Sequence, residues 1–376
     1  MKMCVQRVIT PEGVLDNTSI TVEDGIIVAI EPAGDKPVQS GTLMPGYFDT
    51  QVNGGGGVLF NQHPDAESLN KLASAHLRFG TTSMLPTLIT DGEAAMARAA
   101  DAIAEVIASD HPTIVGVHFE GPFLNVAKKG VHEAGFIRHP KDSELAILTR
   151  ADLGKVLVTV APDTVDVGFI RELVAAGVVV ALGHSNATYE QAVAALTAGA
   201  TGFTHLYNAM SALQSRAPGM VGAALNQSDA YCGLIVDHHH VHPQSAALAI
   251  KTKTAQRIML VTDAMAHVGT DITELAFFNT VIERHGDKLV TPEGTLAGSC
   301  LDMHTAVLNS HRDLGFSLAE VSTMASQTPA RFIGNEQHLG SIAVGQTANL
   351  LLLDEALNIE TIWLRGKAVA NGEIRL

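Results

Sequence analysis

The pattern of apolar and polar residues divides the chain into a long central part and two shorter ends. From about residue 43 to residue 300, apolar runs of strand length alternate with stretches rich in Ala, Leu and Glu. Eight such runs occur: LMPGYFDT, TTSMLPT, TIVGVHFE, VLVTVAP, VVVALGHS, TGFTHL, CGLIVD and IMLVTDA. Continuous apolar runs followed by helical patterns such as GEAAMARAADAIAEVIAS are typical of parallel strands buried on both faces.

This alternation predicts an α/β fold. Eight strand–helix units over roughly 250 residues match a (β/α)8 TIM-like barrel. The alternative is an open, doubly wound sheet. It is less favoured because no Gly-x-Gly-x-x-Gly motif follows the first strand and opens a helix.

The two ends of the chain follow another pattern, one of short alternating strands and turns. The N-terminal part reads MCVQRVIT, PEGVL and SITVEDGIIVAIE, in which Glu23-Asp24-Gly25 is a hairpin signal. The C-terminal part reads ANLLLLD and IETIWLRGKAVANGE. We therefore expect a small β-sandwich domain built from residues 1–43 and 341–376, and a barrel domain over residues 44–340.

Composition and charge limit the classes of partner. The 376 residues are 46% hydrophobic, which is enough for a large core. The net charge of −15 argues against nucleic acid or an anionic membrane as the main partner, although a locally positive site can still bind a small anion. No apolar run reaches the ~18–20 residues of a membrane helix. The N-terminus lacks the apolar stretch of a signal peptide. Because the three cysteines are scattered, we expect a cytoplasmic protein.

Chemically active side chains stand at the ends of the predicted strands, where a barrel carries its active site. Glu120 follows the third run, His184 the fifth and His205 the sixth. Two imidazoles and one carboxylate are a ligand set of catalytic zinc, which keeps one position for water. Taken singly, each residue has a structural explanation, such as a loop cap for Glu120. Their coincidence favours a metal site.

Two further strand ends are open to more than one interpretation. Asp263 follows the eighth run and could be a fourth ligand, a general base or an N-cap. The first run ends in Gln51 and Asn53, neither of which is a usual ligand of a transition metal. For Asn53, turn chemistry ahead of the four glycines is an equally good explanation.

The motifs around these residues closely resemble those of the N-acetylglucosamine-6-phosphate deacetylases of the amidohydrolase superfamily. The resemblance runs from about residue 43 to residue 350 in the same order and spacing. It is carried by MPGYFDTQVNGGGG (44–57), LPTLIT (85–90), HFEGPFLN (118–125), KKGVH (128–132), GHSNAT (183–188), THLYNAM (204–210), APGMVGA (217–223), VTDA (261–264) and GTLAGS (294–299).

The resemblance implies an activity and a cofactor. The expected reaction hydrolyses the acetamide of N-acetyl-D-glucosamine 6-phosphate to D-glucosamine 6-phosphate and acetate, in amino-sugar catabolism. Glu120, His184 and His205 would hold one divalent metal ion per subunit. Zn2+ is the first expectation, but the same ligands accept Fe2+, Co2+ or Mn2+.

The resemblance also implies roles for other residues. Asp263 would take a proton from the activated water and return it to the sugar nitrogen. His132 would hydrogen-bond the carbonyl oxygen, and Gln51 would shape the site beside an empty second-metal position. Expected substrate contacts are Gln51, Asn208, Ala209, Arg216, His240, Ala297, Gly298 and Ser299.

Two of these contacts imply a homodimer. Arg216 and His240 would bind the phosphate, because a guanidinium fork suits phosphate oxygens, and would reach the active site of the neighbouring subunit. Taken without the resemblance, Arg216 is an ordinary surface arginine and His132 a loop histidine.

The match weakens after the seventh strand. The family pattern is Asp-Gly-x-His-Val-Asp, whereas residues 237–242 read DHHHVH. The extra histidines His238, His239 and His242 have three open explanations: harmless substitution, an adapted phosphate recognition or pH response, or an adventitious second metal. His267 and Cys300 are further departures near the site. Two rival functions therefore stay open: deacetylation of another N-acetylhexosamine phosphate, such as N-acetylgalactosamine 6-phosphate, and a ligand-binding barrel without catalysis.

Overall fold

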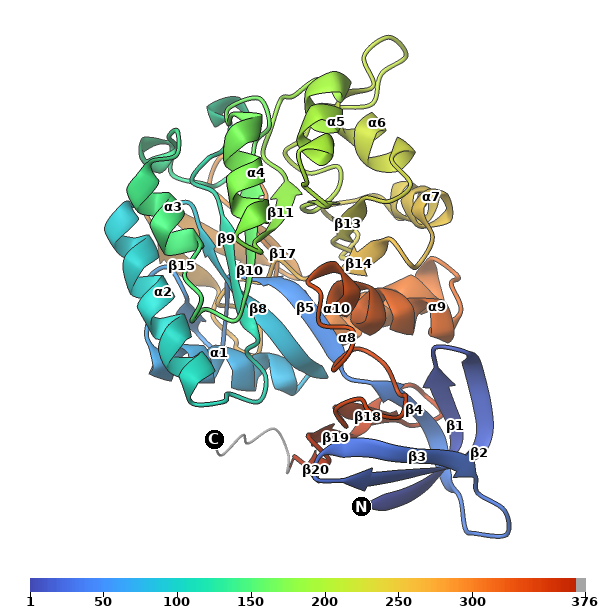
Figure 1. Ribbon diagram of the computed structural model, residues 1–376. Coiled ribbons are helices and arrows are strands. Elements are labelled where there is room, and N and C mark those ends of the chain that lie inside the picture. The colour runs from blue at the N-terminus through green and yellow to red at the C-terminus, as the bar shows by residue number, and fades with distance from the viewer. Residues whose placement is uncertain (370–376) are drawn as a thin grey trace.

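The structure, a computed structural model, describes residues 1–369 and contains a nearly closed parallel barrel beside a smaller β domain (Figure 1). Eight parallel strands follow one another around the barrel in chain order. They are β5 (Tyr47–Val52), β8 (Thr81–Ile89), β9 (Gly116–Glu120), β10 (Lys155–Val160), β11 (Val179–Leu182), β12 (Gly202–Phe203), β13 (Tyr231–Leu234) and β14 (Ile258–Leu260). Each overlaps one of the eight apolar runs and extends beyond it by at most two residues, so the predicted TIM-like barrel is confirmed.

Helices cover the outside of the barrel, with one apolar face each turned to the strands (Figure 1). In α2 (Glu93–Ala108), the buried residues Met96, Ala99, Ile103 and Val106 recur at helical spacing. The other helices are α1 (Ala66–Leu77), α3 (Asp142–Leu148), α4 (Val167–Ala175), α5 (Tyr189–Thr197), α6 (Gly219–Asn226), α7 (Pro243–Lys253), α8 (Met303–Leu308), α9 (Leu318–Ser322) and α10 (Thr328–Phe332).

The first and last barrel strands meet at a seam without a regular ladder, since β5 and β14 are the two edges of the sheet. The seam is closed just beyond the strand ends. The amide of Asp263 donates to the carbonyl of Gln51 at 3.0 Å, and the amide of Asn53 donates to the carbonyl of Ala264 at 2.9 Å. The seam therefore brings the polar ends of these two strands together.

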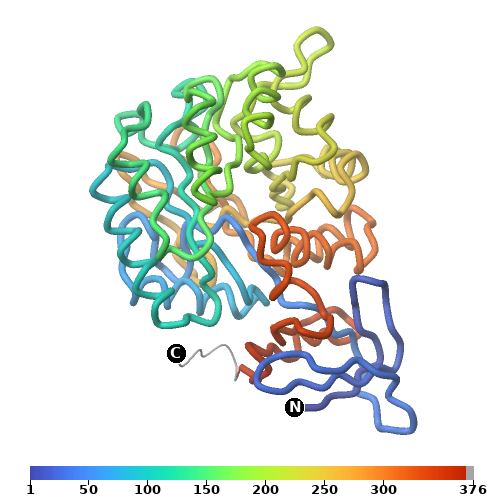
Figure 2. Tube along the Cα trace, viewed as in Figure 1, coloured from blue at the N-terminus to red at the C-terminus, as the bar shows by residue number. Residues whose placement is uncertain are grey.

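The two ends of the chain form the smaller domain, as expected. Figure 2 shows the blue N-terminal segment beside the red segment that follows residue 340. One seven-stranded sheet joins β1 (Lys2–Thr10), β2 (Gly13–Glu23), β3 (Ile26–Pro32), β4 (Gln39–Pro45), β18 (Leu350–Leu353), β19 (Ile359–Leu364) and β20 (Lys367–Ala368). It bends over its own core into a sandwich, and the amide of Ile27 donates to the carbonyl of Gln346 at 2.9 Å.

The hairpin at Glu23-Asp24-Gly25 is confirmed, with φ angles of 48° and 81° at Asp24 and Gly25. The domain boundaries stay a prediction, because β4 runs across the first of them. Residues 370–376 of the expected second segment lie outside the described residues.

A three-stranded antiparallel sheet follows β14 and was not predicted from the sequence. Its strands are β15 (Glu274–Phe277), β16 (Thr280–His285) and β17 (Lys288–Val290). Phe277, Ile282 and Leu289 from this sheet pack against Leu59, Ile89 and Met265 near the carboxyl ends of the strands. A small hairpin of β6 (Gly54–Gly55) and β7 (Val58–Leu59) lies at the same end. Within residues 1–369, no helix has the length and apolar character needed to cross a membrane.

Candidate active site

The carboxyl ends of the barrel strands open into a cavity of about 490 Å3. This is a usual size for a site that binds a small molecule. The cavity is lined by Asn53, Ile89, Glu120, Ala127, Lys128, Gly130, Val131, His132, His184, His205, Asn208, Ala209, His240, Asp263, Met265, Gly294, Thr295, Leu296 and Gly298. The chemically active strand ends recognised in the sequence therefore share one space.

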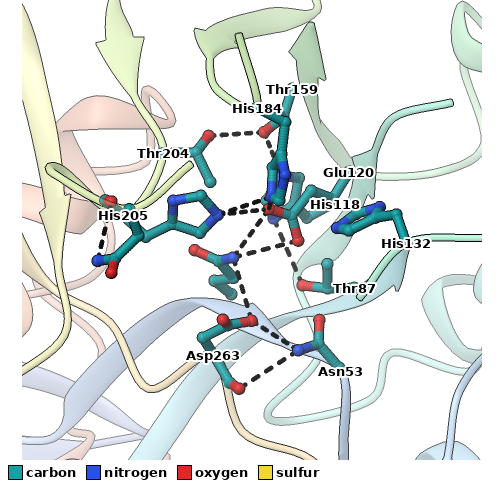
Figure 3. A network of polar contacts seen from close by, with 12 residues as sticks. Asn53, Thr87, His118, Glu120, His132, Thr159, His184, Thr204, His205 and Asp263 are labelled. Atoms are coloured by element: carbon teal, nitrogen blue, oxygen red, sulfur yellow. Dashed lines mark hydrogen bonds and ion pairs between the residues drawn. The ribbon is translucent and has the colours of Figure 1, made fainter. Parts of the chain in front are cut away.

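Glu120, His184 and His205 converge at the floor of this cavity (Figure 3). Glu120 Oε1 lies 3.2 Å from His184 Nε2 and 3.0 Å from His205 Nε2, and the two ring nitrogens are 3.0 Å apart. All three residues are buried. A carboxylate and two imidazole nitrogens that point at one position fit a divalent cation, so this cluster could hold a metal ion.

The backbone at the cluster is bent into an unusual conformation. His184, His205 and Asp263 have φ angles of +47°, +34° and +52°, in the left-handed region that residues other than glycine rarely adopt. Such strain is found where surrounding contacts fix a functional geometry. One such contact joins His184 Nδ1 to the carbonyl oxygen of Lys128 at 2.8 Å. Because Nδ1–H donates there, the lone pair of Nε2 faces the cluster.

The charges of the cluster depend on one another. Burial alone raises the pKa of Glu120, but hydrogen bonds from His184 and His205 outweigh it and hold this pKa well below its usual range. Burial alone lowers the pKa of His205, but the hydrogen bond and charge of Glu120 raise it above the usual value. The ionised carboxylate is thus stabilised by hydrogen-bond donors and positive charge at its side, and a metal ion supplies positive charge as well.

Asp263 lies beside the cluster and is held by two amide groups from β5. Asn53 Nδ2 donates to Asp263 Oδ1 at 2.6 Å, and Gln51 Nε2 donates to the same oxygen at 3.2 Å. Gln51 Nε2 also lies 3.2 Å from both carboxylate oxygens of Glu120. Burial and then the charge of Glu120 raise the pKa of Asp263. The side chain is therefore suited to accept a proton.

His132 forms the opposite side of the cavity from His205 (Figure 3). Its ring centroid is 4.3 Å from that of His184, and its Nδ1 lies 2.8 Å from the hydroxyl of Thr90. Burial and then the charge on His184 hold the pKa of His132 well below its usual range, so the ring is neutral. When the Thr90 hydroxyl donates to Nδ1, Nε2 carries the proton and can donate to a ligand.

The expected substrate contacts divide into two groups. Asn208, Ala209, His240 and Gly298 line the cavity, as expected. Gln51 lies beneath its floor, where it contacts Glu120 and Asp263 instead of the cavity. The role of Gln51 in shaping the site agrees with these hydrogen bonds, and its expected contact with substrate stays a prediction.

Two residues of the 294–299 loop lie outside the cavity lining. Ala297 and Ser299 are buried and do not line the cavity. The Ser299 hydroxyl donates to the carbonyl of Thr262 at 2.6 Å, and its amide donates to the carbonyl of Asp263 at 2.9 Å. Ser299 therefore supports the segment that carries Asp263, and the expected substrate contacts of Ala297 and Ser299 stay predictions.

The two residues expected to reach a neighbouring subunit lie in different places. His240 lines the cavity of its own chain, where its Nδ1 is 2.6 Å from Asp237 Oδ2. This contact turns the ring toward the cavity of its own chain, and the expected reach of His240 to a neighbouring subunit stays a prediction. Arg216 is exposed in the segment between α5 and α6 and does not line the cavity of its own chain.

The extra histidines have separate structural contacts. His238 Nε2 pairs with Asp313 at 2.9 Å, His239 Nε2 pairs with Asp287 at 2.8 Å, and His242 Nδ1 accepts from the amide of Gln244 at the start of α7. Within residues 1–369, Glu120, His184 and His205 form the one group of three or more metal-binding side chains. The structure thus gives the extra histidines no second metal site.

Several residues of the site were missed in the sequence. Lys128 and Thr90 contact the two histidines His184 and His132, and Met265 and Leu296 line the cavity. The KKGVH and GTLAGS motifs pointed to two of these segments but not to the particular side chains. Thr90 ends the LPTLIT motif but was not singled out, and Met265 had no signal, because isolated apolar residues occur at most strand ends.

Comparisons with known proteins agree with this fold and site. A model of the amidohydrolase family matches residues 42–369. The chain is 46% identical to the N-acetylgalactosamine-6-phosphate deacetylase of Shewanella sp. (strain ANA-3), with 98% of this chain and 95% of the relative covered. It is 34% identical to the N-acetylglucosamine-6-phosphate deacetylase of Haemophilus influenzae, with 95% and 96% covered. The crystal structure of the N-acetylglucosamine-6-phosphate deacetylase of Pasteurella multocida matches with a TM-score of 0.94 at 35% identity, with 98% and 100% covered.

The chain therefore belongs to the amidohydrolase family, and the protein is a hydrolase. Within this family it belongs to the group that contains the N-acetylgalactosamine- and N-acetylglucosamine-6-phosphate deacetylases.

Removing one donor of the cluster should remove the metal. We expect His184→Asn and Glu120→Gln to lower the metal content of the purified protein from about one ion per chain to nearly none, because two buried donors hold an ion poorly. Elemental analysis measures this content. His139→Asn, at an exposed position, is the control and should keep the full content. A full complement of metal in both cluster variants would contradict the assignment.

Proposed function

We propose that the protein hydrolyses the acetamide of an N-acetylated hexosamine 6-phosphate to the free amine and acetate. The observation that carries this proposal is the convergence of Glu120, His184, His205 and Asp263 on one cavity. A cation-binding cluster beside a carboxylate of raised pKa is the arrangement that amide hydrolysis needs. The names of the relatives supply the class of substrate.

Among the two epimers, we favour N-acetyl-D-galactosamine 6-phosphate over N-acetyl-D-glucosamine 6-phosphate. The relatives from Shewanella and from Escherichia coli O157:H7 that carry the galactosamine name are 46% and 37% identical to this chain, against 34% for the Haemophilus relative with the glucosamine name. This changes the preference drawn from the sequence motifs, which was for N-acetyl-D-glucosamine 6-phosphate.

Each residue of the site has a part in this reaction. A divalent ion in the Glu120–His184–His205 cluster, with Zn2+ as our first candidate and Fe2+, Co2+ or Mn2+ as alternatives, supplies Lewis acidity and lowers the pKa of a water molecule. Asn53 and Gln51 hold Asp263 Oδ1, which leaves Oδ2 to accept a proton from water and return it to the sugar nitrogen. His132 Nε2–H donates to the carbonyl oxygen as negative charge develops there.

The sugar phosphate lies on the other side of the cavity in this proposal. His240 and the backbone around Asn208 and Ala209 face the substrate there. Arg216 reaches the phosphate of a neighbouring subunit, so the active form is a cytoplasmic homodimer. The exposed position of Arg216 supports this part of the proposal.

An assay of both epimers tests the choice of substrate. We expect kcat/KM, measured by acetate release, to be at least ~10-fold higher for N-acetylgalactosamine 6-phosphate, which corresponds to ~1.4 kcal/mol of transition-state stabilisation. A higher kcat/KM for N-acetylglucosamine 6-phosphate would instead support the substrate expected from the sequence motifs. If the metal-loaded protein releases acetate from neither, the rival function of a non-catalytic barrel is correct.

Replacing Asp263 should separate proton transfer from metal binding. We expect Asp263→Asn to keep the full metal content and to lower kcat by about 100-fold or more, because an amide cannot accept the proton. Elemental analysis and acetate release give the two quantities. Asp229→Asn, at an exposed position in the loop before β13, is the control and should leave kcat unchanged. Full turnover in Asp263→Asn would exclude this residue from proton transfer.

Removing the guanidinium of Arg216 should weaken phosphate binding alone. We expect Arg216→Ala to raise KM for the phosphorylated sugar by about 10-fold or more, and to leave activity on the unphosphorylated sugar unchanged. Arg171→Ala, on the outer helix α4, is the control. Equal effects of Arg216→Ala on both sugars would show that Arg216 does not contact the phosphate.

A further inference from the structure

A second carboxyl group lies one layer below the cavity, and the proposed reaction does not use it. Asp49 on β5 is fully buried, with 0% of its surface exposed, and so is Thr262 at the end of β14. The Thr262 hydroxyl donates to Asp49 Oδ2 at 2.5 Å, and the Thr262 amide lies 3.4 Å from Asp49 Oδ1. The amide of Gln51 donates to the same Oδ1 at 3.1 Å. Asp49 and Thr262 are called the cross-seam pair below.

The cross-seam pair takes the place of missing backbone pairing. Within residues 1–369, β5 and β14 share no regular ladder, although every other pair of neighbouring barrel strands does. One carboxyl group spans this gap and binds an amide from each side. It therefore fixes the position of one strand end relative to the other at the point where the polar side chains of the site begin.

The residues that follow the cross-seam pair in the chain contact one another at Asp263, the proposed proton acceptor. Gln51 and Asn53 follow Asp49 on β5 and donate to the carboxylate of Asp263, which directly follows Thr262. A shift of β5 relative to β14 would separate the side chains of Gln51 and Asn53 from that of Asp263. Asp263 also has a left-handed φ of +52°, a strained conformation that must be held by its surroundings.

A buried carboxyl group is an unusual choice for a purely structural contact. Burial raises the pKa of Asp49 to about 7, although hydrogen bonds from Thr262 and Gln51 favour its charged form. An apolar pair would close the seam without this penalty. Asp49 and Thr262 do not line the cavity. They therefore act through another residue.

We propose that Asp49 and Thr262 are positioning residues, which hold the strand ends in the register that places Asp263 between Asn53 and the substrate amide. This proposal rests on the proposed function for the identity of the reaction. The geometric part concerns Asp263 alone and can be measured without any substrate.

Isosteric replacement of Thr262 tests the proposal. Thr262→Val removes the hydroxyl and keeps the shape, and we expect kcat to fall by about 10- to 100-fold with KM changed by less than about 2-fold, because misplacement of a reacting group by ~1 Å costs that much. Thr262→Ser keeps the hydroxyl and should restore most of kcat. Thr81→Val is the matched control, because Thr81 is equally buried, sits on the neighbouring strand β8 and has no hydrogen-bond partner for its hydroxyl. An unchanged kcat in Thr262→Val, or no rescue by Ser, would overturn the proposal.

Two variants of Asp49 separate the effect of hydrogen bonding from the effect of charge. They also test the proposal if Thr262→Val does not fold. The side chain of Asp49→Asn can still accept from both amides and donate to the Thr262 hydroxyl, so we expect kcat within about 5-fold of the parent. Asp49→Ala should lose as much kcat as Thr262→Val. If Asp49→Asn and Asp49→Ala lose kcat equally, hydrogen-bonded positioning is refuted.

A crystal structure tests the positioning role of Asp49 and Thr262 independently of the proposed reaction. In a crystal structure of metal-loaded Thr262→Val or Asp49→Ala, we expect the Asp263 Oδ1–Asn53 Nδ2 distance to grow from 2.6 Å beyond hydrogen-bonding range. An unchanged distance would overturn the proposal whatever the substrate. Absence of acetate release by the parent protein, in contrast, would refute only the proposed function.

Discussion

The structure of the site depends on one unfavourable arrangement: three buried donor atoms that point at one another. Two imidazole nitrogens lie 3.0 Å apart, and a carboxylate oxygen lies within 3.2 Å of both. Lone pairs at such distances repel unless a proton or a cation lies between them. The surrounding structure keeps them together: His184 and His205 follow the neighbouring strands β11 and β12, Glu120 ends β9 on the far side of β10, and the left-handed backbone of both histidines turns their rings inward. A fold that accepts this cost needs a positive charge at its centre.

The amides of Gln51 and Asn53 fit the proposal of a single cation. Glu120 and Asp263 are two neighbouring carboxylates, and in many sites a second metal ion would lie between such groups. Here Gln51 Nε2 lies 3.2 Å from oxygens of both, so N–H groups occupy the position between them. Neutral donors reduce the repulsion between the carboxylates without binding an ion. They also leave Asp263 with a raised pKa, which a second cation would lower.

The sequence predicted the barrel and the residues of the metal-binding cluster, because both follow local rules. Buried parallel strands are continuous apolar runs, and their carboxyl ends share one face of the barrel, so Glu120, His184 and His205 could be grouped before their distances were known. What could not be predicted depends on contacts between distant segments. The sheet of β15, β16 and β17 is short and half exposed, so it has no strong pattern. The inward turn of Ser299 depends on pairing with β14, and the direction of His240 depends on its ion pair with Asp237.

The histidine run at 238–242 shows how contacts change the interpretation of a motif. From the sequence, adjacent histidines suggested a pH response or a metal, because both need imidazoles that act together. In the structure the side chains point to different partners: His238 to Asp313, His239 to Asp287 on the inserted sheet, and His240 to Asp237. Only the last of these faces the cavity. Three contacts to three separate segments fix the loop on both sides of His240. The two exposed ion pairs are individually weak, because solvent screens them, but together they limit how far the one ring inside the cavity can move.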